Sequence, residues 1–152
     1  MSIRLETSQR TGIDNYQERE ISSFELNWAR NLKTLYPNAI SRTRSTALYN
    51  CHGLTFASRR TGFDARGQLE TILRDDSYKE IEMPDVKAGD VVVYFSDRGD
   101  ANHSGFIVEY RPPEIILPIV CSKWGKAGEF IHGLRDCPQL YGPVIKFYRC
   151  EP

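Results

Sequence analysis

The stretch Asp90-Val91-Val92-Val93-Tyr94-Phe95 decides the fold, because almost every residue in it is β-branched or aromatic. A short apolar run of this kind, bounded by turns, is typical of a buried strand. The polar residues Ser96 to Asn102 follow as a turn, and the alternating stretch His103 to Tyr110 predicts the return strand of a hairpin. The centre of the molecule is therefore expected to be an antiparallel sheet.

Further strands are predicted downstream of this hairpin and helices upstream of it. The three downstream strands are expected at Ile115 to Cys121, Glu129 to His132 and Val144 to Arg149, which gives about five strands in all. The helices are expected at Ser23 to Tyr36, Cys51 to Arg60 and Ala65 to Asp75, with Ser22 or Ser23 as the N-cap of the first and a loop at Ser41 to Tyr49. Helices followed by a run of strands predict an α+β fold.

The length and charge fit one globular domain. The chain has 152 residues, with 20 Lys and Arg against 20 Asp and Glu. This balance argues against a dedicated nucleic-acid-binding protein, which usually has a basic face. A hydrophobic content of 40% argues against intrinsic disorder. Residues 1–20 are polar and are expected to form a loosely ordered arm, and residues 21–152 are expected to form the single domain.

Membrane and secretion signals are not expected. No apolar run approaches the roughly 18 residues that span a membrane, and the first residues contain no apolar signal segment. The cysteines Cys51, Cys121, Cys137 and Cys150 are too scattered for a disulfide scaffold. We expect a cytoplasmic protein with reduced thiols, and delivery by a specialised secretion system is compatible with these features.

Cys51 is the best candidate for a nucleophile, because it lies at the predicted start of a helix, directly after a loop. A helix N-terminus carries about half a positive charge, which favours the thiolate. A nearby imidazole would form an ion pair with it and protonate a leaving group, and His103 can do so if the hairpin packs against that helix end. His52 is expected to point elsewhere, as a supporting or surface residue, because adjacent helical residues diverge by about 100°.

Three short motifs carry a resemblance to a known family. Asn50 to Thr55 (Asn-Cys-His-Gly-Leu-Thr) resembles the nucleophile motif Asp-Cys-Ser-Gly-Leu of the NlpC/P60 cysteine peptidases. Lys87 to Tyr94 is similar to their Pro-Gly-Asp-Leu-Val-Phe-Phe strand, and His103 to Val108 resembles their His-Val-Gly-Ile-Tyr strand. The order of the motifs suits this family and the related CHAP amidases. Asn50, His52 and Ala88 depart from the usual Asp, Ser and Pro.

The resemblance covers Tyr49 to Tyr148 and implies a papain-like (NlpC/P60-type) fold, with N-terminal helices packed on an antiparallel sheet. It implies Cys51 and His103 as catalytic residues. The third group, which would orient the His103 ring, is left open between His132 and Ser122. The remaining candidates for substrate binding lie beside the motifs or in two Gly-containing segments, where flanking glycines permit close approach; they are Tyr49, Asn50, Ser122, Lys123, Trp124 and Tyr141. Lys123 could equally be a surface charge, and Trp124 and Tyr141 could be packing residues.

The resemblance implies a cysteine hydrolase that cleaves an amide bond through a thioester, with no cofactor or metal. The expected substrate is a peptide or a peptidoglycan-like amide, with an immunity or inhibitor protein as a possible partner and no nucleic-acid or membrane partner. An acyltransferase of the same fold and a catalytically inactive binding module are the alternatives. A zinc site built from Cys51, Cys121, His103 and His132 is a further one, although no pair among them has a chelating spacing. The arginines at 42, 44, 59 and 60 are expected on solvated faces or around an acidic substrate.

Overall fold

The computed structural model describes all 152 residues. Three α-helices precede most of the sheet, and they are α1 (Ser23–Leu35), α2 (Cys51–Phe56) and α3 (Leu69–Asp75). The seven strands are β1 (Ile40–Ser41), β2 (Tyr78–Ile81), β3 (Val91–Phe95), β4 (Ala101–Glu109), β5 (Ile119–Lys123), β6 (Glu129–Gly133) and β7 (Val144–Cys150). Three short 3₁₀ turns complete the chain, namely η1 (Met83–Asp85), η2 (Gly125–Ala127) and η3 (Gln139–Tyr141).

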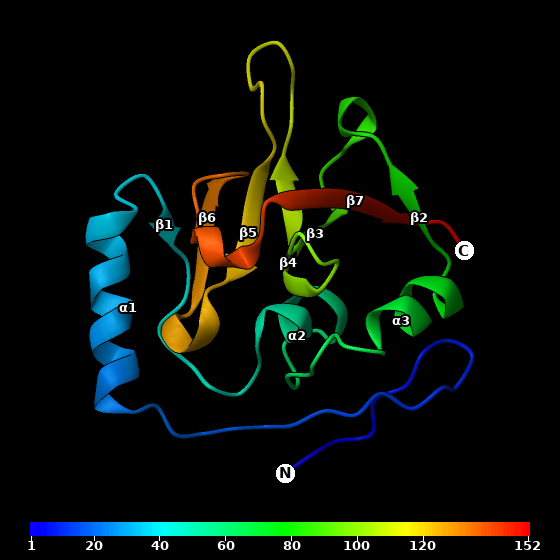
Figure 1. Cartoon of the computed structure of the whole chain (residues 1–152), viewed down its shortest axis with the longest axis horizontal. Helices are drawn as coiled ribbons and strands as arrows, with labels where there is room; N and C mark the ends of the chain where they lie inside the picture. Colours follow the sequence, from blue (N-terminus) through cyan, green and yellow to red (C-terminus); the bar gives the residue numbers. More distant parts are fainter.

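All seven strands form one antiparallel sheet in the order β1-β6-β5-β4-β3-β7-β2. The expected hairpin, β3 and β4, lies at its centre, and β7 returns from the end of the chain to pair with β3 (Figure 1). The mixed architecture with a central antiparallel sheet confirms the α+β class. The sheet places the start of β4 beside the start of α2, which are the two segments that carry the predicted nucleophile and base.

One face of the sheet supports the larger core. Val92 and Tyr94 of β3 point to this face, where Leu32 of α1 packs over the β5–β6 side. The segment between β6 and β7 covers the same face with Leu134 and Tyr141. This alternation of buried side chains along the strands is the period-two pattern that a two-sided sheet requires.

The opposite face is covered by the two shorter helices. Val91 and Val93 of β3 contact Leu69 of α3, and Cys121 of β5 contacts Leu54 of α2. The sheet is thus buried on both sides, which explains why the β3 stretch reads as a continuous apolar run rather than an alternating one.

The strand count of about five is wrong, because the sheet has seven strands. The two additional strands are β1, which overlaps the expected loop only at Ser41, and β2, in a stretch with no expected element. Both are edge strands, and β1 is exposed while β2 has no fully buried residue, so their sequences have no buried apolar pattern. β1 and β2 are strands because they pair with β6 and β7, and not because their residues favour strand geometry.

The helix boundaries differ from expectation at two points. The first helix is confirmed, with Ser22 as its N-cap and a reciprocal bond to Glu25. The second ends at Phe56 rather than Arg60, because Ser58 and Arg59 adopt left-handed backbone angles that a helix cannot continue through. The third begins at Leu69 rather than Ala65.

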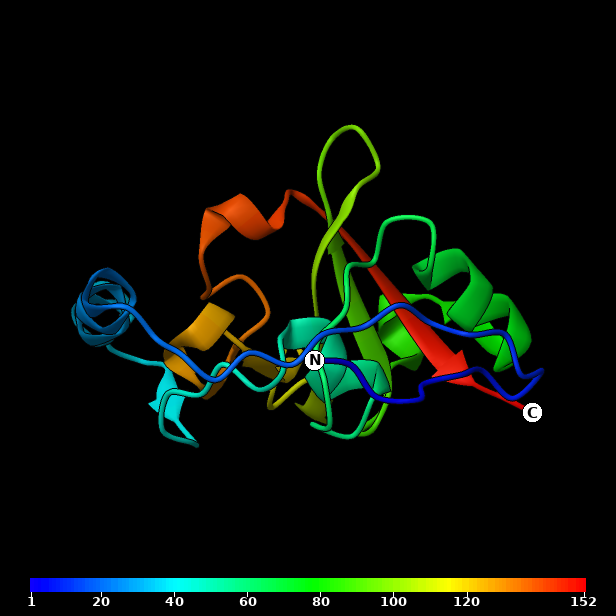
Figure 2. The same cartoon turned by 90° about the horizontal axis from the view of Figure 1, so that it is seen from below.

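Residues 1–20 contain no helix or strand and run along α2 and α3, as Figure 2 shows from below. Hydrogen bonds attach this segment to α3 and to the loop that follows α2. The Thr7 hydroxyl donates a hydrogen bond of 2.6 Å to Asp75 at the end of α3, and Tyr16 forms a two-way backbone bridge with Gly62. Ile13 is buried against the α2–α3 region. None of the helices has the length and apolar character needed to cross a membrane.

Gly53, in the first turn of α2, has no room for a side chain. A Cβ atom there would lie 1.9 Å from the carbonyl oxygen of Thr61. Gly53→Ala should therefore lower the free energy of unfolding by about 1–3 kcal/mol or more, measured by urea denaturation. Gly12→Ala is the matched control, because nothing lies within 4 Å of its added Cβ. Equal stability of the two variants would contradict the packing described.

Candidate functional site

Cys51 is the first residue of α2, and Asn50 fixes the start of this helix. The Asn50 Oδ1 atom accepts a hydrogen bond of 2.9 Å from the Gly53 N–H, which is an N-cap contact. Its Nδ2 atom donates to the Phe63 carbonyl at 2.8 Å and to the Tyr16 hydroxyl at 3.2 Å. An aspartate could accept the first bond but could not donate the other two. Asn50, in place of the Asp of the motif that this segment resembles, therefore has a structural reason.

The Cys51 thiol lies beside two imidazoles, those of His52 and His103. Burial by itself would raise the pKa of this thiol, but the charges and hydrogen bonds of the two rings outweigh burial and bring the pKa well below its ordinary value. The same pairing raises the pKa of His52 against the opposing effect of its burial. The sequence predicted one of these two neighbours. It missed the other, because helical divergence suggested that His52 would point away.

His103 is held by ring stacking. It is 1% exposed, and its ring lies parallel to that of Tyr141, with centroids 3.6 Å apart and an interplanar angle of 4°. Tyr94 borders the ring on a second side, with centroids 5.5 Å apart. The His103 Nε2 atom and the Tyr141 hydroxyl are both buried without a hydrogen-bond partner. Tyr141, which lies on η3, is therefore a stacking partner of His103.

The expected orienting role of His132 or Ser122 is not seen. His132 Nδ1 lies 2.7 Å from the Gly133 carbonyl, so this nitrogen must be the donor. Its Nε2 atom lies 2.7 Å from the Ser122 hydroxyl, which in turn accepts a 3.0 Å bond from the Trp124 indole N–H. Burial lowers the pKa of His132 to about 4, consistent with a neutral ring. Both nitrogens are thus used, and neither His132 nor Ser122 hydrogen-bonds to His103.

The expected substrate wall is also corrected. Ser122, Lys123 and Trp124 are completely buried, and Tyr141 is buried except for 6% of its surface. Trp124 stacks on Phe130 and belongs to the main core. Because these side chains have no solvent-facing surface, they support the site from beneath rather than line it. The alternation of β5 buries Ser122 and Lys123 on opposite sides of the sheet.

Lys123 is part of a buried polar cluster beneath the loop that leads to Cys51. Its ammonium donates hydrogen bonds to the carbonyls of Thr46 (2.7 Å) and Gly125, and it lies 5.0 Å from the centre of the Tyr49 ring. Burial lowers the pKa of this amine to about 8. The expectation of a surface charge or a substrate contact is replaced by a structural role, in which Lys123 ties two loops to β5.

Glu129 is the second charged member of this cluster and is fully buried. It forms an ion pair of 2.7 Å with Arg59 and accepts a hydrogen bond from the Tyr49 hydroxyl. Arg42 approaches the Cys121 sulfur at 3.6 Å, and that sulfur is 3.8 Å from Glu129. Arg42 and Arg59 are both exposed residues, but their guanidinium groups also reach this cluster, Arg59 at the Glu129 carboxylate and Arg42 at the Cys121 sulfur.

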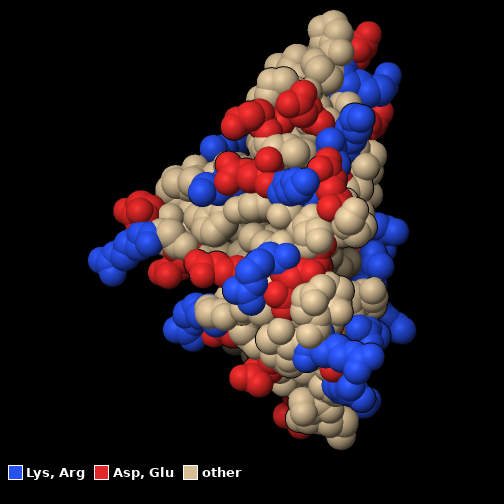
Figure 3. Space-filling view, turned by 90° about the vertical axis from the view of Figure 1, so that its right-hand side faces the viewer, with Lys and Arg blue, Asp and Glu red and all other residues tan.

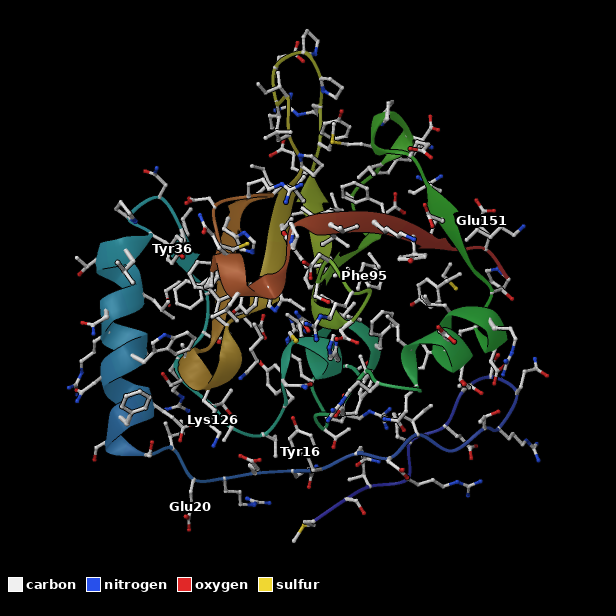
Figure 4. The ribbon with its side chains drawn as sticks, viewed as in Figure 1. Tyr16, Glu20, Tyr36, Phe95, Lys126 and Glu151 are labelled. Atoms are coloured by element: carbon white, nitrogen blue, oxygen red, sulfur yellow. The ribbon has the colours of Figure 1, made fainter.

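Cys51 opens onto a polar pocket of about 360 Å³. Its lining residues are Asn50, Cys51, His52, Asp64, Ala65, Arg66, Asp100, Ala101 and Asn102. A second pocket, of about 320 Å³, lies on the other side of Asn50 and has an aromatic wall of Tyr16, Trp28 and Tyr49. Figure 4 places Tyr16 below α2 and Lys126 at the foot of α1, at two ends of this second pocket. Of the predicted substrate-binding residues, Tyr49 and Asn50 border these pockets.

No group of three or more His, Cys, Asp or Glu side chains gathers closely enough to hold a metal ion, so the four residues considered as zinc ligands do not form such a site. Lysine and arginine alternate with acidic side chains over the face shown in Figure 3, without a large patch of one sign. No family model matches the chain, and no curated protein or solved structure is significantly similar to it.

The buried neutral His132 makes stability depend on pH. An unfolded histidine has a pKa near 6.5, so between about pH 6.5 and 4 the unfolded state binds more protons than the folded state. Stability from this residue is present above pH 6.5 and should fall by about 3 kcal/mol as the pH drops to 4. Urea denaturation of the wild type and His132→Gln over this range measures the difference. Parallel stability curves would show that His132 is not buried in its neutral form.

Proposed function

We propose that this protein is a cysteine hydrolase of papain-like (NlpC/P60-type) architecture that cleaves an amide bond. The observation that carries the proposal is the placement of the Cys51 thiol beside His52 and His103, in surroundings that favour the thiolate. Cys51 begins a helix packed on an antiparallel sheet, and His103 lies on the neighbouring strand β4. This is the arrangement that nucleophilic catalysis by a thiolate and an imidazole requires.

The proposed reaction has two steps. The Cys51 thiolate attacks the amide carbonyl carbon, and the C–N bond breaks after His103 transfers a proton to the leaving amine. His103 then removes a proton from water, whose oxygen attacks the thioester and releases a carboxylic acid and the free thiolate. As the first residue of α2, Cys51 has a backbone N–H without a partner within the helix, which is suited to stabilise the oxyanion.

The polar pocket beside Cys51 supports a peptide-like substrate. Asp64, Arg66 and Asp100 give its wall charges of both signs, and Asn50 and Asn102 add amide groups. Such a wall matches the amide, carboxylate and ammonium groups of a peptide, an isopeptide or a peptidoglycan stem peptide. It is a poor match for an extended apolar chain, which would leave these polar groups without partners.

Substitution of the two central residues tests the hydrolase proposal. Cys51→Ala should abolish amide hydrolysis, and His103→Ala should reduce it by about 10²–10⁴-fold, because proton transfer to the leaving group is lost. The measurement is product release from a panel of peptides and peptidoglycan fragments, followed by mass spectrometry. Cys150→Ala is the matched control, since Cys150 is exposed and far along the chain from the site.

Hydrolysis that persists in Cys51→Ala would contradict the proposal. So would a wild-type protein that binds peptide fragments without cleaving or acylating any of them, which is the behaviour of an inactive binding module. Transfer of the acyl group to an added amine, with no release of free acid, would show an acyltransferase instead of a hydrolase.

A further inference from the structure

Two imidazoles lie beside one thiol, and their surroundings differ. We propose that His52 is a catalytic residue that holds Cys51 as a thiolate, while His103 carries the proton between substrate and water. This inference rests on the proposed function and adds a division of labour to it. Its basis is a chain of hydrogen bonds that orients the His52 ring. The His103 ring has no such chain and is held by stacking.

The chain begins at His52 and ends at the peptide group of Cys51. Thr55 Oγ1 donates to the Cys51 carbonyl at 2.9 Å, and Ser104 Oγ donates to Thr55 Oγ1 at 3.0 Å. Ser104 has one hydroxyl hydrogen, which this bond uses. Its 2.8 Å contact with His52 Nδ1 must therefore have the histidine as donor. The network thus fixes a proton on Nδ1, and Nε2 is the nitrogen that gains or loses a proton.

The groups that face His52 favour its charged form. The Cys51 sulfur and the Ala101 carbonyl both stabilise the imidazolium, and the Asp64 carboxylate adds to this effect. Asp100 and Arg66 line the same pocket and contribute opposite charges. The Phe63 ring borders the imidazole, with centroids 5.7 Å apart, and helps to exclude water. His52 is 4% exposed, so little solvent screens its charge from the thiolate.

His103 lacks a comparable anchor. Its Nε2 atom has no hydrogen-bond partner, and its ring is held by stacking on Tyr141 rather than by a directional bond. The hydrogen bond of this ring is to the Cys51 sulfur and to no other group of the protein, so its proton can be given to a leaving amine and later replaced from water. His52 remains protonated through both steps, and the atoms balance as in the hydrolysis described above.

A thiolate titration by ultraviolet absorbance separates the two roles, with Cys51→Ala as the blank. We expect His52→Gln to raise the pKa of the thiol toward the ordinary value near 8.5, which lowers the thiolate fraction at about pH 6 by up to about 10²-fold. His103→Gln should retain most of the thiolate but lose hydrolysis. Ser104→Ala, which removes the anchor of His52 and the bond to Thr55 but keeps both imidazoles, should shift the titration in the same direction by a smaller amount. Circular dichroism checks that each variant is folded.

Several results would overturn the inference. If His103→Gln removes the thiolate and His52→Gln does not, the roles are reversed, and if both remove it equally, no division exists. If His52→Gln is unfolded, an unchanged titration in Ser104→Ala contradicts the role of the anchored ring. An ordinary thiol pKa in the wild type would overturn the hydrolase proposal as well, whereas a low pKa that is independent of His52 would overturn this inference alone.

Discussion

The first turn of α2 packs against β4, and the arrangement of the site depends on this contact. Thr55 and Ser104 connect the two elements by hydrogen bonds, and Gly53 lets the Thr61 carbonyl approach within a distance that no Cβ would allow. On β4, Gly105 serves the same purpose toward β5, because a Cβ there would lie 2.6 Å from the Cys121 carbonyl oxygen. A shift of α2 by one side-chain radius would separate the Cys51 thiol from the His103 imidazole and break the contact between His52 and Ser104.

The charged cluster of Lys123, Glu129 and Arg59 lies beneath residues 42–50, which lead to Cys51, and supports the same geometry. Buried charges are costly unless they are paired and hydrogen-bonded. Glu129 meets this condition with Arg59 and Tyr49, and Lys123 does so with two backbone carbonyls. These contacts tie residues 42–50 to β5 and β6. The cluster therefore fixes the residues that precede Cys51, and removal of one partner would leave a buried charge beneath the site.

Much of the fold could be predicted because burial leaves a pattern in the sequence. Three features could be predicted in this way, namely the apolar run of β3, the cap of α1 at Ser22 and Glu25, and the position of Cys51 at a helix start. The edge strands β1 and β2 were not, because their residues are mostly exposed and acquire strand geometry from their neighbours. Local residue composition does not reveal such long-range pairing.

The site was predictable only where local sequence determines it. Cys51 at a helix start and His103 at a strand start were expected to lie close together, and the structure places them so. The anchoring of His52 by Ser104 joins residues that are distant in sequence, and the stacking of Tyr141 on His103 depends on the path of η3. His132 looked like an orienting group because it lies on the strand expected to carry one. Its two nitrogens are instead bonded to Ser122 and the Gly133 carbonyl.

The central claim is that Cys51 is a thiolate at neutral pH. The most direct test is the rate of alkylation by iodoacetamide as a function of pH, read at Cys51 and at the exposed Cys150 in the same molecule by mass spectrometry. If Cys51 is a thiolate, its alkylation continues well below about pH 7, where the alkylation rate of an ordinary thiol with a pKa near 8.5 declines. Cys51 labelling that rises only with Cys150, or that needs denaturant at every pH, would contradict it.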